Sequence, residues 1–210
     1  FEQDHNWCPT MLPNGRILYL RWEYTDLPHF ASRILFHMNP DGTNQVEYYG
    51  SNSYWPNSLF YARPIPNSQG KFVGIVGGHH GVPRMGELVL FDSQKGKFEA
   101  DGVIQQIPGW GKKVEPIIED HLVDNSWPKF LHPFPLNDKY FLVSCKPSPK
   151  AHWGIYLVDV FDNVLLLNEE PGLELLEPIP IKPTKRPPVI PDRVRLSVKT
   201  STMYISDIYQ

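Results

Sequence analysis

The feature that most constrains the fold of this chain is a threefold internal repeat. Each copy opens on a tryptophan that is followed within two residues by a proline, at Trp7, Trp55 and Trp127. Each copy continues with a polar turn, an apolar run, a loop, a second apolar run and a turn rich in Asn, Asp or Gly. Because these turn residues favour hairpin connections, we expect each copy to be a series of short antiparallel strands.

A repeat of about 50 residues that holds four short antiparallel strands is typical of a β-propeller blade. The sequence therefore predicts an all-β protein of the β-propeller class, similar to WD40 propellers, with almost no helix. The strands that the apolar runs predict are residues 16–22, 33–38, 71–76, 87–91, 140–145 and 154–159. A plain β-sandwich also explains alternating strands, but it does not explain the recurring Trp-Pro start.

The repeats predict the organisation of the chain. The propeller region covers residues 1–173, with three recognisable blades near residues 7–50, 55–102 and 127–170. The second interval between the tryptophans is longer than the first, so residues 104–120 are interpreted as an insertion in which a short helix could form.

The remaining residues follow a different pattern. Residues 174–192 are rich in proline and predict an extended connector or a partial blade, and residues 193–210 predict the start of a further β segment. Three blades do not close a ring. We therefore expect a fragment of a larger protein, whose unpaired sheet edges and open blade faces favour self-association.

Composition excludes several classes of partner and cofactor. A net charge of −3 argues against nucleic acid, and no apolar run reaches the roughly 20 residues that span a bilayer. The chain has no C-x-x-C-H motif, so no covalent haem is expected within it. Its two cysteines, Cys8 and Cys145, are interpreted as buried thiols in preference to a disulfide.

The strongest candidate for a functional site is the pair His79 and His80 within Gly77-Gly78-His79-His80-Gly81, directly after a predicted strand. The matching loops of the other two repeats, residues 25–32 and 147–153, contain His29 and His152. Loops at matching positions of propeller blades emerge on one face of the disc. Asp26 and Arg21 lie in or beside the first of these loops and complete the candidate ligand-binding set.

Three interpretations of the histidine pair remain open. The glycines could form a bulged strand end whose imidazoles bind locally or face solvent. Alternatively, His79 and His80 ligate a divalent transition metal, although adjacent residues on a strand point to opposite faces. A catalytic role would need a carboxylate to orient the imidazole. The adjacent acids at residues 119–120 and 169–170 are interpreted as solvated turns, and His80 is expected to be more exposed than His79.

Several stretches also resemble a known family. In order, "LPNGRILYLRWEY", "GGHHG", "FLVSCKPS" and "KRPPVIPDRV" are similar to the TolB-like propeller domain of the hydrazine synthase alpha-subunit middle-domain family, and the resemblance covers residues 7–210. It implies a six-bladed propeller in a large secreted or periplasmic bacterial protein, beside haem-bearing domains that lie outside the propeller. Because this chain lacks a haem-attachment motif, the resemblance does not extend hydrazine synthesis to it.

Together these observations predict a non-catalytic β-propeller scaffold or binding module of a periplasmic or extracellular protein. Its partners would be the remaining domains of the parent protein or another protein subunit. The alternative is a propeller domain that contributes a His-lined metal or redox site, through His79 or His80, to a multidomain oxidoreductase resembling the hydrazine synthase alpha subunit.

Overall fold

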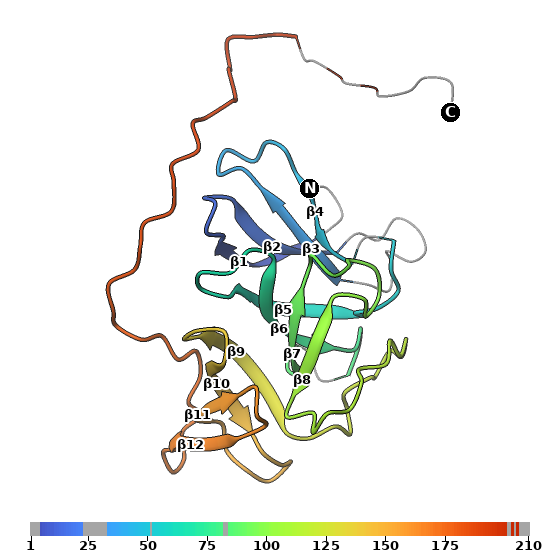
Figure 1. Ribbon diagram of the computed structural model, residues 1–210, viewed down its shortest axis with the longest axis vertical. Coiled ribbons are helices and arrows are strands. Elements are labelled where there is room, and N and C mark those ends of the chain that lie inside the picture. Colours follow the sequence, from blue (N-terminus) through green and yellow to red (C-terminus); the bar gives the residue numbers. More distant parts are fainter. Residues whose placement is uncertain are drawn as a thin grey trace.

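The computed structural model describes residues 5–22, 33–50, 52–81, 84–200, 203 and 205. These residues form twelve β-strands and no helix (Figure 1). The all-β fold predicted from the sequence is therefore confirmed for this part of the chain. A helix long and apolar enough to cross a membrane is likewise not found among the described residues.

The strands form three consecutive antiparallel meanders, one for each copy of the sequence repeat. Unit 1 contains β1 (His5–Met11), β2 (Ile17–Trp22), β3 (Arg33–Met38) and β4 (Val46–Tyr49). Unit 2 contains β5 (Ser58–Pro64), β6 (Lys71–Gly77), β7 (Glu87–Asp92) and β8 (Val103–Ile107). Unit 3 contains β9 (Lys129–Pro135), β10 (Tyr140–Lys146), β11 (Gly154–Asp159) and β12 (Val164–Asn168).

The six predicted strands correspond to the second and third strands of the three units. β3 and β11 have the predicted bounds, and the other four differ by one residue at one end, which is the usual uncertainty at the end of an element. One boundary was wrong, because Ile104–Ile107, assigned to the insertion, belong to β8. No helix forms in the rest of the insertion, all of which the structure describes.

The three units follow one another in space, with unit 1 at the top and unit 3 at the bottom of Figure 1. A single parallel pair, Arg33 with Ser58, joins units 1 and 2 into an eight-stranded sheet, and unit 3 forms a separate four-stranded sheet. The backbones of Gly86 and Phe130 bridge units 2 and 3 with N–O distances of 3.3 and 2.8 Å. Neither sheet closes on itself.

The first strands of the units lie beside one another, since β1 contacts β5 and β5 contacts β9. Each first strand contains a bulge at the same place relative to its partner strand. In each bulge two residues lie opposite one residue of the partner strand, and the first of the two is Cys8, Tyr61 or His132, with φ values of 53°, 53° and 49°. The same irregularity at three matching positions shows that the units repeat in backbone geometry as well as in sequence.

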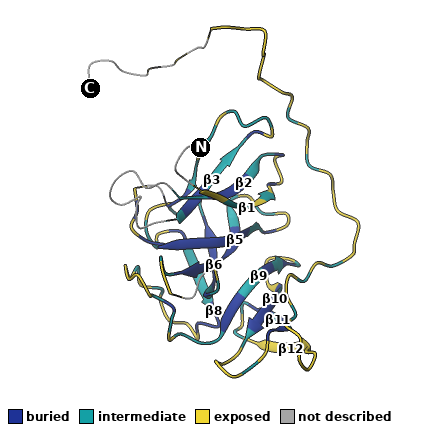
Figure 2. Ribbon diagram, turned by 180° about the vertical axis from the view of Figure 1, so that it is seen from behind, coloured by how far each residue is buried: buried dark blue, intermediate teal, exposed yellow. Residues whose placement is uncertain are grey.

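Packing between the units buries most of unit 2. All residues of β6 except Lys71 are buried, because this strand lies between units 1 and 3. Phe72 of β6 stacks on Phe91 of β7 at a centroid distance of 4.8 Å, and Tyr49 of unit 1 meets both rings edge-on. β12, at the free edge of unit 3, is exposed along its whole length (Figure 2).

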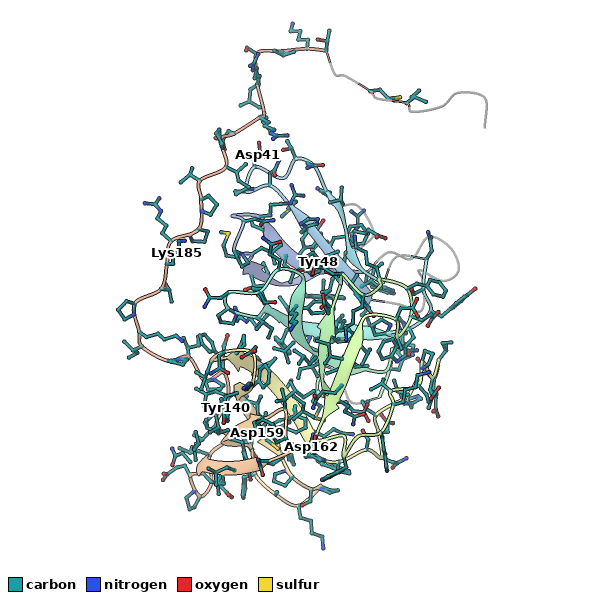
Figure 3. All side chains as sticks on the ribbon, in the orientation of Figure 1. Asp41, Tyr48, Tyr140, Asp159, Asp162 and Lys185 are labelled. Atoms are coloured by element: carbon teal, nitrogen blue, oxygen red, sulfur yellow. The ribbon has the colours of Figure 1, made fainter. Side chains whose placement is uncertain are left out.

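Beyond Asn168 the described chain forms no strand and is called here the C-terminal arm (residues 169–200). The arm starts on unit 3, where Leu175 N–H donates to Trp153 O at 2.9 Å and Glu177 N–H donates to Ser144 Oγ at 3.0 Å. It then extends to unit 1, where Arg193 N–H donates to Asp41 Oδ2 at 2.6 Å (Figure 3). The two cysteines are free thiols, half-buried at Cys8 and buried at Cys145.

Candidate functional site

The two histidines lie at the start of the loop that follows β6, and a distant segment of the chain packs on this loop. The backbone of Gly78 lies so close to Asp120 O and Leu122 N that no side chain fits at position 78. At Gly81 a Cβ would meet the Asp124 carboxylate and the His121 ring, and the φ of +90° favours glycine as well. The glycines around the histidine pair therefore admit segment 117–124, which contains the end of the insertion and the four residues that follow it.

His80 is held by Asp120 through its backbone and its side chain. Its N–H donates to Asp120 O at 3.0 Å and to Asp120 Oδ1 at 3.2 Å. Its imidazole Nδ1 lies 2.8 Å from Asp120 Oδ2. The hydrogen bond from His80 lowers the pKa of Asp120, which favours the carboxylate. Because an ionised carboxylate can only accept hydrogen bonds, the Nδ1 of His80 carries the proton of this bond. In the neutral imidazole, Nε2 is then the hydrogen-bond acceptor.

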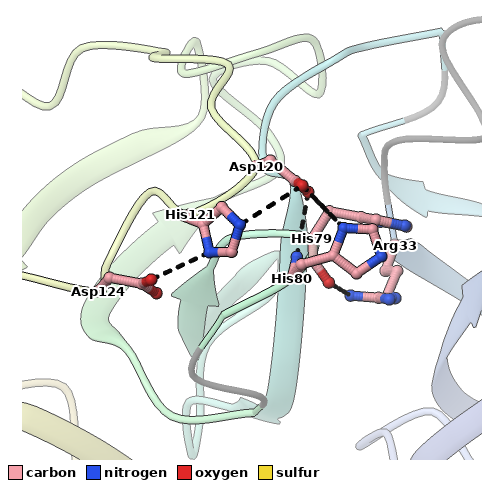
Figure 4. A network of polar contacts seen from close by, with 6 residues as sticks. All are labelled: Arg33, His79, His80, Asp120, His121 and Asp124. Carbon is pink, nitrogen blue, oxygen red and sulfur yellow. Dashed lines mark hydrogen bonds and ion pairs between the residues drawn. The ribbon is translucent and has the colours of Figure 1, made fainter.

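A second histidine and a second carboxylate extend this contact. His121 Nε2 lies 3.8 Å from Asp120 Oδ2, and His121 Nδ1 lies 3.0 Å from Asp124 Oδ2 (Figure 4). The result is an alternating chain of imidazoles and carboxylates, His80–Asp120–His121–Asp124, called here the His-Asp cluster. It lies at the surface, since 66% of the His80 side chain and 51% of the Asp120 side chain are exposed.

His79 is turned toward unit 1 and serves the packing of the two units. Its ring lies 5.6 Å from the ring of Trp22, and its carbonyl oxygen accepts a hydrogen bond from Arg33 Nη1 at 2.7 Å. The Arg33 guanidinium lies over the rings of Trp22 and Trp7 at 5.4 and 5.9 Å, and burial lowers its pKa. The prediction that His80 is the more exposed of the pair is confirmed, because His79 is half-buried.

The other candidate residues lie elsewhere or outside the described part of the chain. His152, in the loop after β10, places its Nδ1 3.3 Å from Glu174 Oε1 of the C-terminal arm. Arg21 donates from Nη1 to Gln45 Oε1 at 3.1 Å and lies over the Phe36 ring. Asp26 and His29 fall in residues 23–32, which are not described, so their placement stays a prediction.

The sequence did not identify Asp120, His121 and Asp124 as members of the site. Asp120 was interpreted as part of a solvated turn, yet it is the residue that orients His80. A local signal exists in the His-x-x-Asp spacing of residues 121–124, but the pairing of Asp120 with His80 spans 40 residues and has no local signature. Sequence reasoning could state only that a catalytic histidine would need such a carboxylate.

The His-Asp cluster can hold a proton and orient an imidazole. A carboxylate on Nδ1 fixes the orientation and the tautomer of the ring, which is the arrangement found in metal-ligating and general-base histidines. Among the described residues, no group of three or more His, Cys, Asp and Glu side chains is placed to hold a metal ion. The expectation that His79 and His80 ligate a divalent metal stays a prediction.

Comparisons with known proteins give one structural likeness. No family model matches the chain, and no curated protein matches it. Among solved structures, it is similar to hydrazine synthase of Kuenenia stuttgartiensis, with a TM-score of 0.53 and 18% sequence identity over 79% of this chain and 20% of that chain. The chain thus spans about a fifth of the length of that chain. The resemblance inferred from the sequence is confirmed at the level of the fold, which is all that this identity shows.

Proposed function

We propose that the chain is a non-catalytic scaffold or binding module built as part of a β-propeller, within a larger periplasmic or extracellular protein. The observation that carries the proposal is the serial arrangement of units 1, 2 and 3. Their first strands lie side by side and carry the same bulge, as expected of blades arranged around an axis. The structural likeness to one fifth of a longer chain supports a role as one domain among several.

A scaffold role also fits the way the chain uses its polar groups. Arg33 binds the His79 carbonyl oxygen, and Asp162 accepts from the backbone of Gly109 and Trp110 at 2.8 and 2.7 Å. Both contacts join one unit to the loops of the next. In a scaffold the remaining domains of the parent protein, or another subunit, would bind to the surfaces that the units leave open.

The alternative function is a His-lined metal or redox site contributed to a multidomain oxidoreductase. The specific observation in its favour is the contact between Asp120 and His80 Nδ1, which leaves the exposed ring with Nε2 as its acceptor. His80 with Asp120 would then hold the metal at Nε2, and the ion would supply Lewis-acid or redox chemistry. Further ligands would come from another domain of the parent protein.

Metal analysis and thermal melting of the purified chain separate the two functions. A scaffold should contain no stoichiometric transition metal after exposure to Zn²⁺, Cu²⁺ or Fe²⁺, and His80→Ala should melt within a few degrees of the wild type. A bound metal would be lost in His80→Ala and would raise the melting temperature of the wild type alone, because a ligand of the folded state stabilises it. His152→Ala, an exposed histidine paired with Glu174, is the matched control. Stoichiometric metal that depends on His80 would overturn the scaffold proposal.

A further inference from the structure

The bulge residues of the first strands form a row that lies outside the His-Asp cluster. β1, β5 and β9 lie one beside the next, so Cys8, Tyr61 and His132 fall at matching positions of neighbouring strands (Figure 2). The rings of Tyr61 and His132 meet edge to face at a centroid distance of 4.3 Å. The backbone N–H of Tyr61 donates a hydrogen bond to the Cys8 sulfur. Each bulge residue therefore contacts the bulge residue of the next unit.

A fourth segment of the chain repeats this pattern in sequence. Residues 131–135 of β9 read LHPFP, and residues 176–180 of the C-terminal arm read LEPIP. Glu177 therefore takes the place of His132, and each of the two residues is followed by a proline. The φ of Glu177 is 57°, close to the 49° of His132. Glu177 thus matches the bulge residues in sequence and in backbone conformation.

The arm also docks on unit 3 in the way that β9 docks on unit 2. In β9, Phe130 N–H donates at 2.8 Å to the carbonyl oxygen of Gly86, the residue before β7. In the arm, Leu175 N–H donates at 2.9 Å to the carbonyl oxygen of Trp153, the residue before β11. Because the two bonds lie at the same place in the repeat, the arm brings Glu177 into line with the three bulge residues.

The four residues share two properties that packing between the units does not require. They are called here the axial row, since propeller blades surround a central channel, and they are Cys8, Tyr61, His132 and Glu177. Each has a positive φ, which glycine adopts without strain and which bulky side chains rarely adopt. Each carries a group that forms polar contacts: a thiol, a phenol, an imidazole or a carboxylate. Residues held at unfavourable φ values occur mainly at binding and active sites, so the axial row is a candidate ligand site.

The axial row is accessible to a small molecule, and an arginine lies beside it. Three members of the row are half-exposed, and the fourth, Glu177, is exposed. Arg84, in the loop between β6 and β7, is also exposed. Its guanidinium lies 5.9 Å from the ring of Trp7 and 6.0 Å from the ring of Phe60, two residues that directly precede members of the row. It also forms a hydrogen bond with the side chain of Tyr61.

Within the axial row, only Glu177 carries a charge near neutral pH. Burial raises the pKa of Cys8 and of Tyr61, and burial lowers the pKa of His132, so these three groups are neutral. The Glu177 carboxylate acts electrostatically on all three of them, and Arg84 acts on the first two. One exposed carboxylate and one exposed guanidinium thus flank the same set of neutral polar groups.

The charges around the row favour one class of ligand. Arg63, the second arginine nearby, is half-buried and donates from Nη1 to Thr10 Oγ1 at 2.9 Å. A ligand that is only a cation would be repelled by the two arginines, and no three His, Cys, Asp or Glu side chains in the described part of the chain are placed to hold a metal ion. A ligand that is only an anion would be repelled by Glu177. A molecule with both charges finds an opposite charge at each end.

We propose that the axial row binds a small zwitterion, with the carboxylate of the ligand at Arg84 and Tyr61 and its ammonium group at Glu177. A free amino acid carries these two groups. Both contacts are charge-assisted hydrogen bonds, which are shorter and stronger than bonds between neutral groups. The rings of Trp7 and Phe60 offer apolar surface beside the carboxylate position. The inference rests on the proposed function, because it gives the binding module a class of ligand.

Isothermal titration calorimetry of the purified chain tests the proposal with five probes. Glycine, β-alanine and γ-aminobutyrate carry a carboxylate and an ammonium group at increasing separation, whereas acetate and methylamine carry one group each. At least one of the three zwitterions should bind at millimolar concentration. Because a hydrogen bond to a charged group contributes at each end, it should bind about tenfold more tightly than acetate or methylamine.

Two variants that each remove one charge make the test specific for the axial row. Arg84→Gln and Glu177→Gln should each weaken binding of the zwitterion by about tenfold. Glu177→Gln should in addition bind acetate more tightly than the wild type does, because it removes the charge that repels an anion. Arg186→Gln and Glu170→Gln, at exposed positions of the C-terminal arm, are the matched controls and should bind like the wild type.

Two results would overturn the inference. One is that no zwitterion binds at millimolar concentration, and the other is that binding is unchanged in both Arg84→Gln and Glu177→Gln. Circular dichroism establishes that each variant is folded, and either of the two exposed positions decides the question if the other variant does not fold. Both results would leave the proposed function standing, because the metal and melting measurements test it separately.

Discussion

The Asp120 carboxylate holds the imidazole of His80 at 2.8 Å, across a sequence separation of 40 residues. This contact attaches the end of the insertion to the loop after β6. It explains why the histidines are flanked by glycines, since Gly78 and Gly81 are where segment 117–124 approaches most closely. The pair Asp120 and His80 therefore fixes the position of this segment on the loop after β6.

The first prediction concerns the strength and pH dependence of this pair. Because both side chains are about half-exposed, Asp120→Asn should lower the free energy of unfolding by less than about 1 kcal/mol near neutral pH. The pKa of folded Asp120 is lowered below its unfolded value, so its contribution is present above about pH 4 and is lost as the pH falls through the folded pKa. Urea unfolding at several pH values should show the difference between variant and wild type shrinking in acid.

Asp138→Asn, at an exposed position of the β9–β10 turn, is the control for a general effect of charge. It should leave the stability unchanged near neutral pH. A difference between Asp120→Asn and the wild type that grows in acid would contradict the assignment of the carboxylate as the stabilising form.

The second prediction concerns Gly78. A methyl group there would collide with the backbone of Asp120 and Leu122, which no side-chain rotation relieves. Gly78→Ala should therefore displace segment 117–124 and destabilise the fold by about 1–3 kcal/mol. The chain just before the displaced segment should also be cleaved faster by trypsin, after Lys112 and Lys113, two exposed lysines.

Gly42→Ala gives the matched comparison for this prediction. Gly42 has a φ of +81° and nothing within 4 Å of its Cβ position, so alanine there incurs only the backbone penalty of about 1 kcal/mol. Tryptic cleavage at the insertion should not change in this variant. Equal stability losses and equal cleavage rates in the two variants would show that segment 117–124 does not depend on close approach at Gly78.

The contrast between strands and site shows what the sequence could predict. The second and third strands of each unit were placed to within one residue, because apolar runs bounded by Asn, Asp and Gly turns are local signals. β8 was missed, since apolar and polar residues alternate only weakly in Val103–Ile107 and the turn before this strand is atypical. The relative exposure of His79 and His80 followed from their order along the strand end, because the later residue lies nearer the loop tip.

The His-Asp cluster could not be predicted, because it depends on the path of the insertion. Nothing in residues 108–126 has a regular period, so the sequence does not indicate that Asp120 returns to the β6–β7 loop. The contact of Arg33 with the His79 carbonyl oxygen depends in the same way on how units 1 and 2 pack. Contacts of this kind are fixed by the tertiary structure and have no local sequence pattern.

The third prediction concerns the two thiols. Burial raises the pKa of Cys145 to about 12, and burial also raises the pKa of the half-buried Cys8. Since the thiolate is the reactive form, the native protein should react slowly with iodoacetamide at Cys8 and not measurably at Cys145. Mass spectrometry of native and urea-unfolded samples checks this. Cys8→Ser should abolish native labelling, and rapid modification of Cys145 in the folded chain would contradict its burial.

The last prediction concerns Asp162, the residue of the β11–β12 turn that caps the start of the insertion (Figure 3). Its carboxylate accepts from the N–H groups of Gly109 and Trp110, and Asp162→Ala leaves both without this acceptor, which should cost about 1–3 kcal/mol. Asp162→Asn keeps one acceptor oxygen and should lose less. Urea unfolding of these variants and of Gln105→Ala, which removes a second side-chain bond to the β11–β12 turn, allows a double-mutant cycle. Because both bonds join the same two units, we expect the two losses to be non-additive. Strict additivity, or an Asp162→Ala variant as stable as the wild type, would show that this turn does not hold units 2 and 3 together.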